Sequence, residues 1–250
     1  MLDQLWYLLL IVAGFLAGII NTIAGGGSFL TLPALMFIGG LDAQTANGTN
    51  RVAILFSSGA ASLTFNGQGY LDKTLALRLT LPTLAGTPIG ALLAIYLPPT
   101  AFRPIFGLIF FVMALVILSD PKRISEAAVK REASKVTLFL VFFAIGIYVG
   151  FIQAGMGILL LVAMSLLHTG DLIASNAVKN LIGFSVTLAA TLVFVAFGHV
   201  AWIPGLVTAI GNLAGGIVGA KLAIKKGNKL IFGFLIVVML ATGAKLLLVG

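Results

Sequence analysis

The sequence has 250 residues, of which 60% are hydrophobic and 9% are charged, and its mean hydropathy is +1.16. Because a soluble domain is about 45–50% apolar and about 25% charged, this composition indicates an integral membrane protein and excludes a soluble enzyme, a nucleic-acid-binding protein and a disordered chain. The net charge of +8 is then a bias of basic residues among loops, and the absence of Cys excludes disulfides and thiolate metal sites.

Apolar stretches of about 20 residues, the length that crosses a bilayer as a helix, predict the membrane-spanning helices of the first half of the chain. Leu5–Ala24 has no basic region before it and no cleavage site after it, so we expect a retained helix that ends at the triplet Gly25-Gly26-Gly27. Ser28–Ile38 would be about 16 Å long, roughly half of the hydrocarbon core. It therefore spans partially or forms a hairpin with the first helix. The next predicted spans are Thr45–Phe65, Thr74–Leu97 and Phe102–Leu118.

A polar stretch, Ser119–Lys135, separates this series from a second series of the same form. The second series is predicted to comprise Val136–Gly155, the short Gly157–Leu167, Ala174–Phe197, Trp202–Ile224 and Leu230–Val249. Motifs recur in the same order, since residues 84–94 resemble residues 213–223 and Ile105-Phe106-Gly107 resembles Ile231-Phe232-Gly233. The alternative is a chance similarity between small-residue segments that let helices pack closely.

These observations predict an all-α integral membrane protein built from two homologous five-segment repeats, residues 1–118 and 136–250, joined by the loop 119–135. Each repeat has a broken or hairpin first helix pair. Basic residues concentrate in the joining loop, around Lys73 and Arg78, and between Lys221 and Lys229. Since basic loops stay in the cytoplasm, the halves are predicted to be inverted, as in many secondary transporters. If the short segments do not cross, parallel halves with four spans each remain.

Charged residues within the predicted spans indicate the kind of ligand. All seven Asp and Glu residues lie in predicted termini or loops, which argues against a proton relay or a cation site. Arg51 and Lys179, by contrast, lie inside the third segment of each half, beside Asn50 and Asn180. A cation at the bilayer centre costs about 2.5–3.5 kcal/mol on insertion scales. Each cation must therefore face protein, water or an anion.

The surroundings of the two cations predict a binding site for a small anion. In both halves, amide and hydroxyl side chains begin the third segment. In the first half, the break Gly25-Gly26-Gly27-Ser28 also exposes backbone N–H groups at the start of a half-helix, where the helix dipole favours an anion. The predicted substrate-binding residues are Arg51, Lys179, Asn50, Asn180, Asn47, Asn176, Asn21, Gln153, Gly25, Gly26, Gly27, Ser28 and Thr49. In the alternative, the cations reach the membrane interface and the triplet is only a flexible turn. No metal site is predicted, because neither His168 nor His199 has a carboxylate or Cys companion at ligand spacing. No cofactor or catalytic residue is predicted, since no motif for an ATPase or hydrolase is present.

Several motifs resemble the sulfite exporter TauE/SafE family. They are Gly14-Phe15-Leu16-Ala17-Gly18, Ala24-Gly25-Gly26-Gly27-Ser28, Pro33, Ala46-Asn47-Gly48-Thr49-Asn50, Gly150-x-x-x-x-Gly155-x-Gly157 and two L-A-G-x-x-x-G-A-x-L-A stretches. The resemblance covers essentially the whole chain, although the second break, Gly155-Met156-Gly157-Ile158, has fewer glycines than is usual for the family.

The resemblance implies a multi-pass permease of the bacterial inner membrane that moves small sulfur-containing anions, such as sulfite or sulfoacetate, usually outward. Together with the paired cations, it leads to the hypothesis of an anion transporter that works by alternating access, with the lipid bilayer and a small anion as partners and no nucleic acid. The alternatives are an anion channel and a membrane scaffold protein that transports nothing.

Overall fold

The computed structural model describes residues 2–118, 133–167 and 172–225, and every regular element in these ranges is an α-helix. The helices are α1 (Leu2–Ile23), α2 (Ser28–Phe37), α3 (Ala43–Gly67), α4 (Lys73–Tyr96), α5 (Pro99–Leu118), α7 (Lys135–Phe151), α8 (Met156–Leu167), α9 (Leu172–Ala196) and α10 (Trp202–Lys225). Four of them contain apolar stretches long enough to cross a membrane. The predicted all-α membrane protein is therefore confirmed. The predicted span 230–249 and most of the predicted loop, 119–132, lie outside the described residues.

Helix α3 shows that a central segment need not be the most apolar one. It was predicted to span the membrane over Thr45–Phe65, and its 25 residues are long enough to do so. It is not among the helices that qualify by hydropathy, because amide, hydroxyl and guanidinium side chains interrupt its apolar sequence. Most of these polar groups are buried. They therefore face other helices rather than lipid.

Both halves contain the predicted helix break. Residues 24–27 separate α1 from α2, and residues 152–155 separate α7 from α8. Gly25 (φ +83°) and Gly155 (φ +73°) adopt the left-handed backbone conformation that glycine tolerates best. Helix α7 ends at Phe151, earlier than the predicted Gly155, because Ile152 is already extended (φ −142°, ψ 130°).

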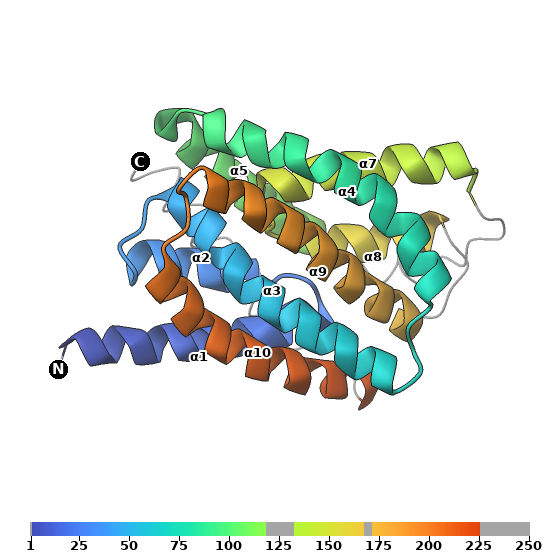
Figure 1. Cartoon of the computed structure of the whole chain (residues 1–250), viewed down its shortest axis with the longest axis horizontal. Coiled ribbons are helices and arrows are strands. Elements are labelled where there is room, and N and C mark those ends of the chain that lie inside the picture. Colours follow the sequence, from blue (N-terminus) through green and yellow to red (C-terminus); the bar gives the residue numbers. More distant parts are fainter. Residues whose placement is uncertain (1, 119–132, 168–171, 226–250) are drawn as a thin grey trace.

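The helices of the two halves are interleaved. Figure 1 shows α10, α3, α9 and α4 next to one another in that order, with α1 against α10 and α7 against α4. The two most extensive contacts, α1 with α10 and α4 with α7, each join the first helix of one half to the fourth helix of the other. Neither half is therefore a separate folding unit.

Glycines bring the backbones of these exchanged pairs into direct contact. A Cβ atom on Gly90 of α4 would lie 1.8 Å from the carbonyl oxygen of Ile147, and one on Gly215 of α10 would lie 2.1 Å from the carbonyl oxygen of Phe15. Such distances leave no room for any side chain. The motifs that recur in the sequence are thus the close-packing surfaces of the two pairs.

The third helices of the two halves pack against each other in opposite directions. A Cβ atom on Gly48, near the start of α3, would lie 2.7 Å from the ring of Phe194, near the end of α9. One on Gly59, further along α3, would lie 3.1 Å from the ring of Phe184, which comes earlier in α9. Helices α3 and α9 are therefore antiparallel.

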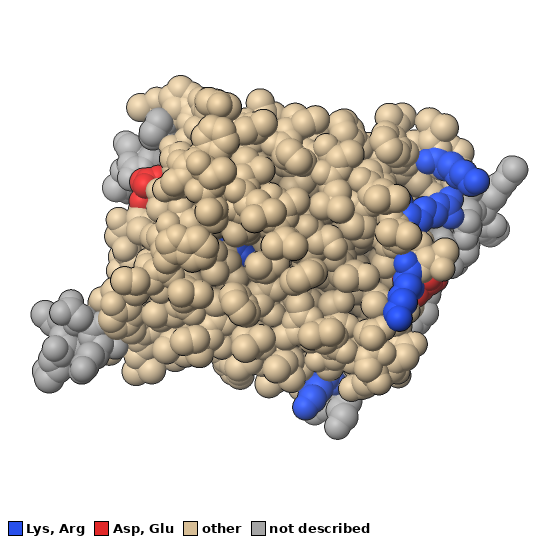
Figure 2. All heavy atoms as spheres, viewed as in Figure 1, with Lys and Arg blue, Asp and Glu red and all other residues tan. Residues whose placement is uncertain are grey.

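The exposed surface between the ends of the bundle is apolar. Leu63, Leu192 and Ile210 are each more than 60% exposed, as expected for side chains that face lipid. Figure 2 shows the exposed basic side chains gathered toward one end of the bundle. These residues are Lys73, Arg78, Lys135 and Lys221. The described members of the three basic regions thus lie at the same end.

Candidate functional site

The two helix breaks meet inside the bundle. The N–H group of Gly157 donates a hydrogen bond to the carbonyl oxygen of Gly25 (3.3 Å). A Cβ atom on Gly25 would lie 2.2 Å from the Cα atom of Gly157, and one on Gly157 would lie 2.4 Å from the Cα atom of Gly25. Only glycine allows this approach. The two breaks therefore converge at Gly25 and Gly157.

Polar side chains from α3 hold the first break in place. The Asn50 amide donates to the Ser28 hydroxyl (3.1 Å) and accepts a hydrogen bond from the Thr31 hydroxyl. This fixes the first turn of α2 against α3. Asn21, one helical turn before the break, is only 4% exposed, and its side-chain amide takes part in no hydrogen bond among the described residues.

Lys179 crosses from the second half to the first break. It is 2% exposed, and its Nζ atom donates to the carbonyl oxygens of Asn21 (3.1 Å) and Thr22 (2.7 Å) in the last turn of α1. The last carbonyl groups of a helix have no partner within it and carry partial negative charge. Lys179 therefore satisfies and neutralises the end of α1.

Arg51 makes the reciprocal contact, from the first half to the second break. Its Nη1 and Nη2 atoms donate to the carbonyl oxygens of Val149 (3.1 Å) and Gly150 (2.6 Å) near the end of α7, and its Cζ atom lies 4.6 Å from the ring centroid of Phe194. Asn47 adds a hydrogen bond to the carbonyl oxygen of Phe151 (2.8 Å). Each third helix thus caps the first helix of the other half.

The second break is held by side chains of its own half. The Gln153 amide nitrogen donates to the Thr187 hydroxyl of α9, and the Tyr148 hydroxyl donates to the carbonyl oxygen of Ala154 (2.6 Å). The Gln153 Oε1 atom is buried without a hydrogen-bond partner in the described part of the chain. This site therefore differs from the first, where the Asn21 amide is unpaired.

The charges at the breaks do not balance. The cations neutralise the negative ends of α1 and α7, whereas α2 has no acidic residue in its first turn and no side-chain cap, and α8 also lacks an acidic first turn. Within the described part of the chain, no turn hydrogen bond is donated by the N–H groups of residues 26–28 or 153–155. The free N–H groups and the positive ends of α2 and α8 favour an anion between them.

Some predicted site residues lie elsewhere. The Thr49 hydroxyl accepts a hydrogen bond from the N–H group of Ala201 (2.9 Å) just before α10. Asn180 donates to the carbonyl oxygen of Asn176 (2.8 Å) within α9, and neither side chain is hydrogen-bonded to a break. The predicted residues that the fold brings to the breaks are Asn21, Gly25, Gly26, Gly27, Ser28, Asn47, Asn50, Arg51, Gln153 and Lys179.

Two hydroxyl groups that were not among the predicted site residues support these side chains. Thr31 lies one turn after Ser28, and Thr187 lies two turns after Asn180 on the polar face of α9. Both spacings are readable in the sequence as polar positions on one helix face. Ser58 and Thr22 each bury a hydroxyl oxygen with no hydrogen-bond partner in the described ranges.

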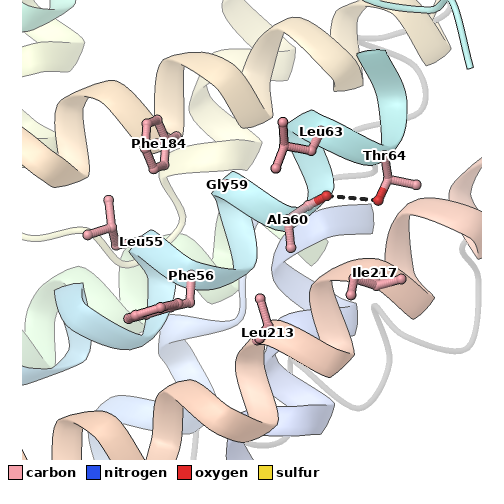
Figure 3. A pocket seen from close by; sticks show the side chains of 9 residues that line it. All are labelled: Leu55, Phe56, Gly59, Ala60, Leu63, Thr64, Phe184, Leu213 and Ile217. Atoms are coloured by element: carbon pink, nitrogen blue, oxygen red, sulfur yellow. Dashed lines mark hydrogen bonds between the residues drawn. The ribbon is translucent and has the colours of Figure 1, made fainter. Parts of the chain in front are cut away.

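A groove on the bundle surface is unsuited to an anion. It has a volume of about 530 Å³ and lies between α3, α9 and α10, lined mainly by apolar side chains such as Leu55, Phe56 and Phe184 (Figure 3). Thr64, the polar residue among its lining residues, donates its hydroxyl hydrogen to the carbonyl oxygen of Ala60 (2.8 Å). The groove offers no free donor.

Comparisons with known proteins give a consistent result. The family described as sulfite exporter TauE/SafE matches residues 10–246. The chain is 32% identical to "Probable membrane transporter protein ORF9" of Sinorhizobium sp, over 99% of this chain and 95% of the relative. It is 30% identical to "Probable membrane transporter protein YfcA" of Escherichia coli (strain K12), over 95% of this chain and 88% of the relative. No solved structure matches the chain.

Proposed function

Because this chain belongs to the sulfite exporter TauE/SafE family, we propose that it is a secondary transporter of the bacterial inner membrane. It exports small sulfur-containing anions, such as sulfite or sulfonates, by alternating access. The observation that carries the proposal is the charge distribution at the breaks, where cations neutralise the two helix C-termini and the two helix N-termini remain free. No catalytic step is part of this function.

The substrate binds where α2 and α8 begin. Backbone N–H groups of residues 26–28 and the Asn21 amide donate hydrogen bonds to oxyanion oxygens from the first half, and residues 153–155 do so from the second. Several short donors suit an anion whose charge is spread over three oxygen atoms. Arg51 and Lys179 attract the anion through their charge while they remain bound to the carbonyl groups at the ends of α7 and α1. Lys179 also has a third N–H available beyond its two hydrogen bonds.

The halves are inverted repeats, and the end with Lys73, Arg78, Lys135 and Lys221 faces the cytoplasm. The antiparallel packing of α3 and α9 and the exchanged contacts of the first and fourth helices support this arrangement. The gathering of exposed basic side chains at one end supports the orientation. In such an arrangement the substrate site lies near the pseudo-twofold axis, at the contact between Gly25 and Gly157.

Counterflow in proteoliposomes tests this function. Vesicles loaded with unlabelled sulfite should accumulate labelled sulfite faster than empty vesicles, because a carrier exchanges substrate across the membrane. Sulfoacetate and other sulfonates should compete, and chloride should not. Uptake without stimulation by internal sulfite would indicate a channel. Absence of any protein-dependent uptake of these anions would reject the proposed substrates.

A further inference from the structure

Met156 fills a space beside the proposed substrate site. Its side chain is 3% exposed and lies against Gly183 of α9, where a Cβ atom would be 3.0 Å from the Met156 Cε atom and 3.9 Å from its Sδ atom. Gly183 comes one helical turn after Lys179, whose Cδ atom would lie 3.0 Å from a Cβ atom on Gly157. The thioether is therefore close to both the cation and the meeting point of the breaks.

A buried hydroxyl oxygen without a partner lies beside this thioether, and the Gln153 side chain donates a hydrogen bond to the thioether sulfur. The Ser58 hydroxyl oxygen would lie 3.4 Å from the same Cβ position on Gly183, and Ser58 is 1% exposed. The Gln153 amide nitrogen lies 4.0 Å from the Met156 Sδ atom. Neither the Ser58 Oγ atom nor the Gln153 Oε1 atom has a hydrogen-bond partner in the described residues. Burying such an atom without a partner is unfavourable, and a hydrogen bond to a polar group of a ligand removes this cost.

The first half has no side chain at the equivalent place. Gly26 and Met156 each follow the glycine with positive φ, Gly25 or Gly155; Met156 begins α8, whereas Gly26 lies in the break before α2. Methionine is flexible and takes up irregular volumes. It can therefore leave this space without a change in the backbone.

From this geometry, and resting on the proposed function, we infer that the Met156 side chain occupies the subsite for the organic substituent of a sulfonate, with Ser58 and Gln153 as its polar groups. The sulfonate oxygens lie at the breaks near Lys179. The substituent displaces the Met156 thioether and meets the Ser58 hydroxyl and the Gln153 amide oxygen. Inorganic sulfite has no substituent and leaves Met156 in place. Met156 thus sets which sulfonates are accepted.

A labelling experiment tests whether Met156 covers Ser58. The chain contains no Cys, so Ser58→Cys introduces a unique thiol. We expect the sulfonate reagent 2-sulfonatoethyl methanethiosulfonate to modify it about tenfold faster in the Met156→Ala background, since reaction rate follows access to the thiol. Propanesulfonate, which does not react with the reagent, should slow the modification. Met164→Ala is the matched control because Met164 is equally buried on α8, and it should leave the rate unchanged. Equal rates in the Met156→Ala and Met164→Ala backgrounds would overturn the inference.

A substrate series supplies the second test. Sulfite counterflow is competed by methanesulfonate, ethanesulfonate and propanesulfonate, and the ratio of their inhibition constants is measured. Met156→Ala should favour propanesulfonate over methanesulfonate by about tenfold relative to the original protein, the usual effect of added methylenes in a pocket. Met156→Leu, which keeps the bulk but is stiffer, should weaken inhibition by propanesulfonate relative to inhibition by methanesulfonate. If sulfite is transported but none of these ratios changes, the subsite is wrong. If the original protein transports no sulfite, the proposed function fails first.

Discussion

Gly90→Ala should loosen the contact between α4 and α7. The new Cβ atom would lie 1.8 Å from the carbonyl oxygen of Ile147 and 2.6 Å from the N–H nitrogen of Phe151. Ordinary contact needs 3.4 Å or more, so the two backbones must separate by about 1.5 Å in an interior that is packed as tightly as a crystal. Overpacking usually costs about 1–3 kcal/mol. Because both obstructing atoms belong to backbone, we expect the upper end, about 3 kcal/mol.

Thermal unfolding of the detergent-solubilised protein measures this cost. For a chain of this length, about 3 kcal/mol corresponds to a decrease in Tm of about 6–12 °C. Gly67→Ala is the matched control, because Gly67 ends α3 and a Cβ atom there would meet nothing within 4 Å. Its Tm should stay within about 2 °C of the unmodified protein, since exposed substitutions change stability by about 0.5 kcal/mol or less. A Gly90→Ala protein as stable as the control would refute the proposed backbone contact.

Two further changes address the helix ends. Lys179→Met leaves the carbonyl groups of Asn21 and Thr22 without their donor and should cost about 2–5 kcal/mol of stability, measured by thermal unfolding. Lys179→Arg should retain most of the stability. Equal Tm values for the three proteins would contradict the role of Lys179 as a cap of α1. Asp42 caps α3 by accepting from the N–H groups of Gln44 and Thr45 (both 3.0 Å). Burial alone raises the pKa of Asp42, but hydrogen bonds from Thr45 and Gln44 bring it below its ordinary value. Asp42→Ala should therefore lower the free energy of unfolding by about 1 kcal/mol at pH 7. This difference between the two proteins should vanish as the pH falls below about 3.9, the ordinary pKa of Asp, and then through the lower pKa of Asp42 in the folded protein. A difference that persists in acid would refute this role.

The helices and the first break could be predicted from the sequence, because these features depend on local composition. Apolar runs placed the helices within a few residues of their observed bounds, and Gly25-Gly26-Gly27 marked the end of α1. The second break was less well placed. Glycine marks a break only where the backbone needs positive φ, and the extended residue that ends α7 is the apolar Ile152.

The partners of the buried cations could not be predicted from the sequence. The pattern indicated that Arg51 and Lys179 must face protein, water or an anion, and both face carbonyl groups that lie 98 to 158 residues away along the chain. Such contacts follow from the exchange of helices between the halves, which no local pattern encodes. The same applies to Ser58, because its place in the proposed subsite follows from the packing of Gly183, beside which both Ser58 and Met156 lie.

Asn21→Asp tests most directly whether an anion binds at the breaks. The substitution is isosteric and breaks no hydrogen bond of the side chain, because the Asn21 amide makes none among the described residues. Lys179, bound to the carbonyl oxygen of the same residue, lies close enough to offset part of the added charge. Folding should therefore survive, which thermal unfolding verifies. Asn66→Asp, at the exposed end of α3, is the control for the chemical change.

The measurement is sulfite counterflow by the two variants. Two negative charges about 4 Å apart repel each other by about 4 kcal/mol at an effective dielectric constant of about 20, so Asn21→Asp should reduce the rate at least tenfold, a loss that needs about 1.4 kcal/mol. Asn66→Asp should transport at the rate of the unmodified protein. A folded Asn21→Asp protein that exchanges sulfite at the unmodified rate would contradict the placement of the anion at the helix breaks.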